Sequence, residues 1–169
     1  MAEHQRPAPD IAAIHADAPA EHLFFAQYRH WMAGYATRDM FFWDCAWDAL
    51  LRFLPPESAK ALYSEFHLFT RILNQRTQRA IGWRPDVCRC LCHDEYCVLK
   101  LVTASQRSDA EREFLAAVEM LGINEAPALL NASRSLAQAL EARNFLLTPV
   151  ARLSKLTVAP CVPHTVTLH

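Results

Sequence analysis

Glycine is scarce in this chain, and its scarcity excludes several classes of protein. Only three of the 169 residues are glycine, at positions 34, 82 and 122. Phosphate-binding loops and the dinucleotide-binding fingerprint both need closely spaced glycines. Strand-rich folds also use glycine in their tight turns. We therefore expect a helical protein without either nucleotide-binding motif.

The chain also lacks the features of a secreted, membrane-spanning or highly basic protein. Its first twenty residues, MAEHQRPAPDIAAIHADAPA, contain no cationic start followed by an apolar run. No apolar stretch approaches the roughly 20 residues of a membrane span. The net charge is −1, whereas binding nucleic acid over a whole surface needs a large basic excess. We expect a cytoplasmic protein with neither a membrane nor a nucleic-acid partner, whose six cysteines stay reduced rather than forming structural disulfides.

Proline and the absence of helical periodicity mark both ends of the chain. Residues 1–19 contain three prolines and are predicted to form a flexible N-terminal arm. Residues 148–169 combine three further prolines with β-branched residues and are predicted to form an extended C-terminal tail. The length suits one domain. We place that domain at residues 20–147.

Apolar residues recur with the helical period in six segments between these ends. The pattern predicts an all-α fold, a compact bundle-like or orthogonal array of about six helices. The chain offers start signals for five of them. Thr37 is the predicted N-cap of the second helix, and Pro55-Pro56 starts the third. The others are Asp94 as an N-cap, Ser108 with Glu111 as a capping box, and Asn124 as an N-cap. The predicted helices cover residues 20–35, 40–54, 56–81, 95–106, 108–121 and 124–143.

Two predictions concern the last turns and faces of these helices. Gly122 and Asn144 are expected to adopt the left-handed conformation that ends a helix. The helix over 108–121 is expected to bury Phe114, Leu115, Val118 and Leu121.

Aromatic residues are concentrated in the first two predicted helices, and the second is apolar almost all round. Some of these rings must close the core, but aromatic residues are also enriched where proteins meet. We therefore expect a non-catalytic regulatory or assembly protein that acts through contact with a protein partner or through self-association. The candidate contact residues are Phe24, Tyr28, Trp31, Phe42, Trp43 and Trp47.

The segment CRCLCHDEYC, from Cys88 to Cys97, contains four of the six cysteines and carries the alternative function. A loop that leads into a helix could gather its thiolates around zinc or an iron–sulfur cluster, although the spacing lacks the paired C-x2-C of zinc ribbons. The candidate metal ligands are Cys88, Cys90, Cys92, His93 and Cys97.

Two further interpretations of the cysteine segment stay open. A thiol redox switch needs a low thiol pKa, which Arg84 and Arg89 favour and the neighbouring acids oppose. Alternatively the cysteines are small buried core residues without chemistry, and we favour this interpretation. No cofactor is then expected.

Other polar groups suggest no catalytic site. Residues 66–85 contain four arginines and no acid, which indicates either an anion-binding patch or, more commonly, a solvated helix face. Asp44, Asp48 and His67 could hold a metal, but the Glu-x-x-His pairs of di-iron bundles are absent and a surface stripe is the simpler interpretation. We find no poised nucleophile with a separate base, so we do not expect an enzyme.

Overall fold

The computed structural model of the protein describes residues 18–88 and 90–149. Six helices and no strand occur in this part of the chain, which confirms the predicted all-α class. Most of the predicted N-terminal arm and C-terminal tail lies outside the described residues. None of the described helices is both long enough and apolar enough to cross a membrane. The helices are α1 (Pro19–Thr37), α2 (Phe41–Leu51), α3 (Pro56–Arg76), α4 (His93–Gln106), α5 (Ala110–Leu121) and α6 (Pro127–Glu141).

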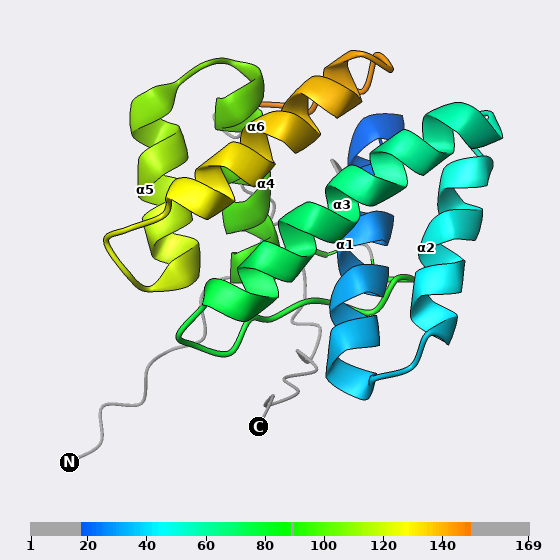
Figure 1. Cartoon of the computed structure of the whole chain (residues 1–169), viewed down its shortest axis with the longest axis horizontal. Helices are drawn as coiled ribbons and strands as arrows, with labels where there is room; N and C mark the ends of the chain where they lie inside the picture. Colours follow the sequence, from blue (N-terminus) through cyan, green and yellow to red (C-terminus); the bar gives the residue numbers. More distant parts are fainter. Residues whose placement is uncertain (1–17, 89, 150–169) are drawn as a thin grey trace.

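The helices pack as two neighbouring groups that share one hydrophobic core. Helices α1 and α2 pack on each other and on α3, and α4 packs on both α5 and α6. The long helix α3 joins the groups because it also packs on α6, as Figure 1 shows. Each of the six helices contributes buried residues to the core. The segment from Thr77 to Cys92 connects α3 to α4.

Proline and left-handed residues set several helix boundaries. Pro19, Pro56 and Pro127 stand in the first turns of α1, α3 and α6, where a missing backbone N–H costs nothing. Gly122 ends α5 with φ +71°, and Asn144 has φ +61° after α6. Both predictions of a left-handed residue are therefore confirmed.

Four predicted helix starts are wrong. Helix α2 has Met40 as its N-cap, whereas the predicted cap Thr37 is the last residue of α1. Helix α4 begins two residues early, because Cys92 and not Asp94 is its N-cap. In α5 the predicted capping box fails because Ser108 is itself left-handed, with φ +55°. The next residue, Asp109, caps the helix by accepting a hydrogen bond from the backbone N–H of Arg112. Helix α6 begins after Ala126 rather than at Asn124.

Helix α3 is shorter than predicted, and α5 presents a different face to the core. The extended backbone of Thr77 ends α3 at Arg76 rather than near residue 81. Phe114 and Leu115 are 44% and 58% exposed, so their predicted burial is wrong. The inward face instead carries Glu113, Ala116, Ala117, Met120 and Leu121.

The burial of Glu113 explains why α5 is rotated. Its carboxylate accepts hydrogen bonds from Ser105 Oγ at 2.7 Å and from the guanidinium of Arg134. A buried carboxylate of this kind is tolerated only when it is fully hydrogen-bonded. The small side chains of Ala116 and Ala117 then let α5 approach α4 closely, and the two bulky residues that follow Glu113 are left at the surface.

Candidate functional site

Three of the six aromatic residues predicted to contact a partner lie in the core. Phe24, Tyr28 and Trp31 are at most 3% exposed. The Phe24 ring lies 5.8 Å from Phe66 of α3, and the Trp31 ring stacks on His67 of the same helix at 4.9 Å. Phe24 and Trp31 therefore join α1 to α3, and all three rings are buried in the fold.

The other three aromatic candidates, on α2, are half-buried. Trp43 and Trp47 pack against the core, with Trp43 5.7 Å from Trp31 and Trp47 5.6 Å from Tyr63. Phe42 lies against Phe41, which is 62% exposed. Whether any of the six meets a partner stays a prediction.

The backbone of the cysteine segment is bound to α1 through one arginine. The Arg29 guanidinium donates hydrogen bonds to the carbonyl oxygens of Cys88 at 2.5 Å and Cys90 at 2.9 Å. It also forms an ion pair with Glu95, in the first turn of α4. The segment is therefore fixed by its main chain, and its sulfur atoms point to different surroundings.

The four cysteines of the segment do not converge. Cys90 and Cys97 are buried, whereas Cys88 and Cys92 are half-buried. The Cys92 sulfur accepts the backbone N–H of Glu95 while the Glu95 carboxylate accepts the backbone N–H of Cys92, so this pair caps α4. Among the described residues, Cys88, Cys90 and Cys92 belong to no group of three possible metal ligands.

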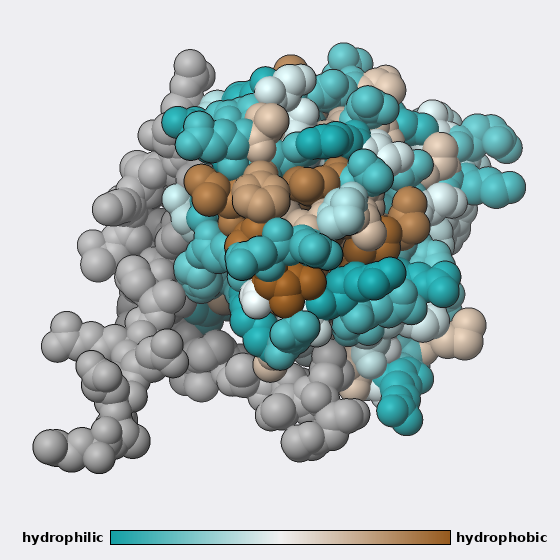
Figure 2. All heavy atoms as spheres, turned by 60° about the vertical axis from the view of Figure 1, so that its left-hand side comes forward, coloured by the Kyte–Doolittle hydropathy of each residue, from teal (hydrophilic) through white to brown (hydrophobic). Residues whose placement is uncertain are grey.

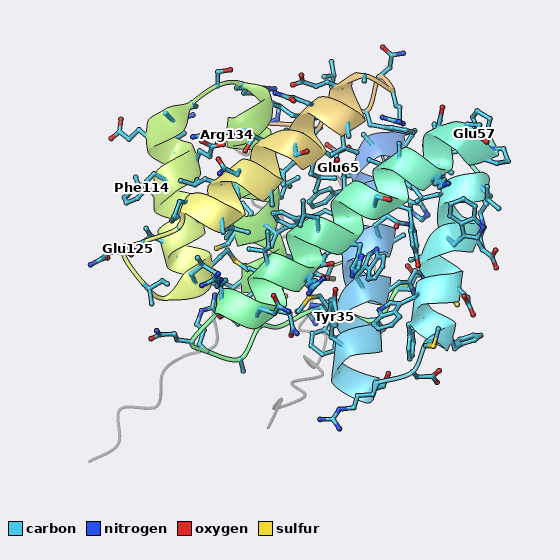
Figure 3. All side chains as sticks on the ribbon, in the orientation of Figure 1. Tyr35, Glu57, Glu65, Phe114, Glu125 and Arg134 are labelled. Atoms are coloured by element: carbon cyan, nitrogen blue, oxygen red, sulfur yellow. The ribbon has the colours of Figure 1, made fainter. Side chains whose placement is uncertain are left out.

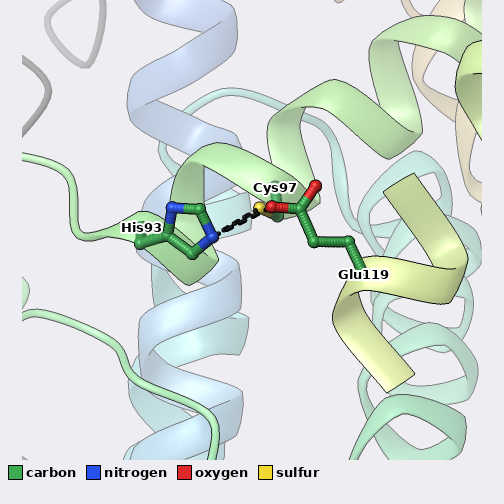
Figure 4. Close-up of side chains that lie close together, drawn as sticks. All are labelled: His93, Cys97 and Glu119. Carbon is green, nitrogen blue, oxygen red and sulfur yellow. Dashed lines mark hydrogen bonds and ion pairs between the residues drawn. The ribbon is translucent and has the colours of Figure 1, made fainter. Parts of the chain in front are cut away.

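His93 and Cys97 do come together, and a residue absent from the sequence prediction joins them. His93 Nε2 lies 3.4 Å from Cys97 Sγ and 3.0 Å from Glu119 Oε1. The three ligand atoms all lie within 4.8 Å of one another. Figure 4 shows His93 and Cys97 side by side on α4, with Glu119 reaching them from α5. We call these three residues the His–Cys–Glu cluster.

Charges around the His–Cys–Glu cluster act on its titrating groups. Burial and the nearby Glu119 carboxylate raise the pKa of the Cys97 thiol well above its ordinary value. Burial alone would raise the pKa of Glu119, but hydrogen bonds from Lys100 and Cys97 hold it below its ordinary value. Lys100 Nζ lies 2.7 Å from Glu119 Oε2, so Glu119 presents one oxygen to lysine and the other to His93.

A groove lies between α4 and α5 and is also lined by Pro149, which follows α6. Its cavity of about 300 Å³ has an apolar floor that includes Ala104, Leu115 and Ala116. The face of the molecule that carries α5, brought forward in Figure 2, has hydrophobic residues exposed among hydrophilic ones. Figure 3 shows the labelled Phe114 on the outer side of α5. Three cations, Lys100, Arg107 and Arg112, and one acid, Asp109, also line this α4–α5 groove.

One polar group in the groove has no hydrogen bond. Thr103 of α4 lines the cavity. Its Oγ1 atom is buried and finds no partner among the described residues. A buried hydroxyl without a partner costs stability, so this atom is either a local defect or a group that a bound molecule would satisfy.

The remaining polar candidates are dispersed. Asp44, Asp48 and His67 are exposed, and the His67 ring lies on Trp31. The arginine run does not form one patch, because Arg84 is buried and Arg79 is bound to the Asp94 carboxylate at 2.6 Å.

Comparison of the chain with protein-family models, with curated proteins and with solved structures finds no match. Its function is therefore inferred from the geometry of these sites.

Proposed function

We propose that this protein is a helical regulatory or assembly protein whose α4–α5 groove binds an acidic amphipathic helix of a protein partner. The observation that carries the proposal is a groove of about 300 Å³ with an apolar floor and a mostly cationic rim. Helix-in-groove recognition uses the apolar face of one helix and the hydrophobic groove of its partner. The aromatic residues of α1 and α2 are not needed for this contact.

The apolar part of the groove supports the proposal through its exposure. Leu115 lines the groove and is 58% exposed, and its neighbour Phe114 is 44% exposed. Burying a side chain of this size completely is worth roughly 1.5–3 kcal/mol. A partner that covers the groove with leucine or phenylalanine side chains would gain a large part of that free energy.

The positive charge at the rim of the groove favours an acidic partner. Lys100, Arg107 and Arg112 outnumber Asp109 at the rim. Arg107 forms no ion pair among the described residues, whereas Arg112 lies 3.4 Å from Asp109. Carboxylates on the polar side of a bound helix would pair with the rim and steer its approach. The last twenty residues of the chain, 150–169, contain no aspartate or glutamate, so no carboxylate side chain among them can pair with this rim, although Pro149 directly before them lines the groove.

A pair of synthetic peptides tests the proposal on the full chain. Each is an amphipathic helix of about 15 residues with leucine on one face. One carries glutamate on the other face and its control carries lysine. Calorimetry should show the glutamate peptide binding at least about tenfold more tightly, a difference of about 1.4 kcal/mol. Leu115→Ser and Arg107→Glu should each weaken it, whereas Phe41→Ser on α2 should not.

Two results would overturn the proposal. The first is equal binding of the glutamate peptide to the wild type and to Leu115→Ser, or no binding at all. The second is self-association of the wild type, seen by light scattering, that Leu115→Ser abolishes. That outcome would make a second copy of this chain the occupant of the groove.

A further inference from the structure

We propose that His93, Cys97 and Glu119 form a binding site for a zinc ion, independently of any partner in the α4–α5 groove. The observation is the convergence of an imidazole, a thiol and a carboxylate from two helices within 4.8 Å. These are the three side-chain types that bind zinc in proteins. This site shares His93 and Cys97 with the predicted cysteine site, but its third ligand is Glu119 and it does not include Cys88, Cys90 or Cys92.

The spacing of the ligand atoms fits a tetrahedral ion. Zinc lies about 2.0–2.1 Å from a nitrogen or oxygen ligand and about 2.3 Å from sulfur, which places neighbouring ligand atoms roughly 3.3–3.6 Å apart. The distance from His93 Nε2 to Cys97 Sγ is 3.4 Å and that to Glu119 Oε1 is 3.0 Å. These two distances are within a few tenths of an ångström of the tetrahedral values, and the third pair, Cys97 Sγ and the Glu119 carboxylate, lies within 4.8 Å.

The helical scaffold holds the ligands in place. His93 and Cys97 stand four residues apart, so their side chains share one face of α4. The sulfur is buried, whereas His93 and Glu119 are exposed, which leaves the site open on its outer side. Three protein ligands and an open side are typical of zinc sites that keep one position for water or another ligand.

The charges of the site also suit a divalent cation. When zinc binds, the Cys97 thiol gives its proton to solvent, and the thiolate and the Glu119 carboxylate together balance the charge of the ion. Lys100 stays on the second oxygen of Glu119, at 2.7 Å, and its positive charge opposes the metal. An iron–sulfur cluster does not suit the site, because such clusters are held mainly by several cysteines and this one offers a single thiol.

Cobalt(II) is the probe for the test, since a thiolate ligand gives this ion an intense charge-transfer absorption. The full chain, reduced and freed of metal, should bind one cobalt per chain, and added zinc should displace it. Glu119→Gln, His93→Gln and Cys97→Ser should each weaken binding at least about tenfold, because they remove one of three ligands. Lys100→Met should tighten binding, because it removes the opposing charge.

Cys92→Ser is the matched control. Cys92 lies one residue before the cluster, and serine can take over its role as N-cap of α4, so this variant should bind cobalt like the wild type. His93 and Glu119 are surface residues, so their variants should keep the wild-type helical circular dichroism. The proposal is overturned if cobalt shows no charge-transfer band, or if Cys92→Ser abolishes binding while Glu119→Gln does not.

Discussion

Arg29 of α1 and Glu95 of α4 form an ion pair in the interior, with 2.6 Å between Nε and Oε1. Their side chains are only 4% and 0% exposed. The carboxylate also accepts the backbone N–H groups of Arg84 and Cys92, while the guanidinium donates to carbonyls of the cysteine segment. Both charged groups of the pair find hydrogen-bond partners within the chain, so they need no water molecules in the interior. The pair can therefore hold the cysteine segment against α1.

Replacing Arg29 by methionine should destabilise the fold by about 3–5 kcal/mol, because it leaves the Glu95 charge buried and unpaired. Urea unfolding followed by circular dichroism measures this free energy. The control is Arg112→Met, whose own side chain is 76% exposed and whose partner Asp109 is half-buried, so the expected loss is at most about 1 kcal/mol. Equal free energies of unfolding for the two variants would show that the buried ion pair contributes no more to stability than the surface pair.

Local patterns in the sequence were sufficient to predict the fold class. Apolar periodicity located all six helices, and the left-handed residues Gly122 and Asn144 were expected where they occur. Errors arose at helix starts, where several capping residues compete. Cys92, which caps α4 through its sulfur, is not a residue that capping preferences favour.

The candidate sites depended on contacts between helices that one sequence does not reveal. The spacing of His93 and Cys97 placed them on one helix face, but no local signal connects them to Glu119. The orientation of α5 was equally hidden, because it is set by the bonds of Glu113 to Ser105 and Arg134 rather than by the apolar pattern. The α4–α5 groove exists because that orientation leaves Leu115 at the surface.

Gly34→Ala should destabilise the contact between α1 and α2, although alanine is the better helix former by about 1 kcal/mol. An added Cβ would lie 2.2 Å from Trp43 Nε1, so the indole ring must move. We expect a net loss of about 1–3 kcal/mol, typical of overpacking, together with a shift in tryptophan fluorescence. Urea unfolding measures the loss.

Gly122→Ala is the comparison for Gly34→Ala. An added Cβ there meets no atom within 4 Å, but φ is +71°, so the expected loss is about 1–2 kcal/mol from backbone strain alone, without a fluorescence shift. An unchanged fluorescence spectrum in Gly34→Ala would contradict the close approach of Trp43.

Thr103→Val and Thr70→Val should change stability in opposite directions. Thr103 Oγ1 is buried without a hydrogen bond among the described residues, so replacing the hydroxyl by a methyl group should stabilise the fold by about 1 kcal/mol. Thr70 Oγ1 donates to the Phe66 carbonyl at 2.7 Å, so its loss should cost about 0.5–1.5 kcal/mol. Thermal unfolding of both variants measures the difference. A loss of stability in Thr103→Val would mean that its hydroxyl is already satisfied.

The Cys92 thiol should make the fold sensitive to alkaline pH. Burial and the Glu95 charge raise the pKa of Cys92 to about 12, compared with about 8.5 in an unfolded chain. Between these two values the unfolded chain releases the proton while the folded chain keeps it. Rising pH therefore favours unfolding, by up to about 1.4 kcal/mol per pH unit for one thiol. The contribution is fully present below about pH 8.5 and is lost progressively above it.

Urea unfolding of the wild type and of Cys92→Ser at several pH values between about 8 and 10 tests this assignment. The free energy of unfolding should fall with pH in both proteins, because burial also raises the pKa values of Tyr28 and Cys97. The slope of this free energy against pH should be smaller in Cys92→Ser, by an amount that corresponds to the release of up to one proton per molecule.

Since serine keeps the cap of α4, the two proteins should be nearly equal in stability at neutral pH. Identical slopes would show that Cys92 ionises as readily in the folded chain as in the unfolded one, and a large difference at neutral pH would show that the sulfur is needed for packing.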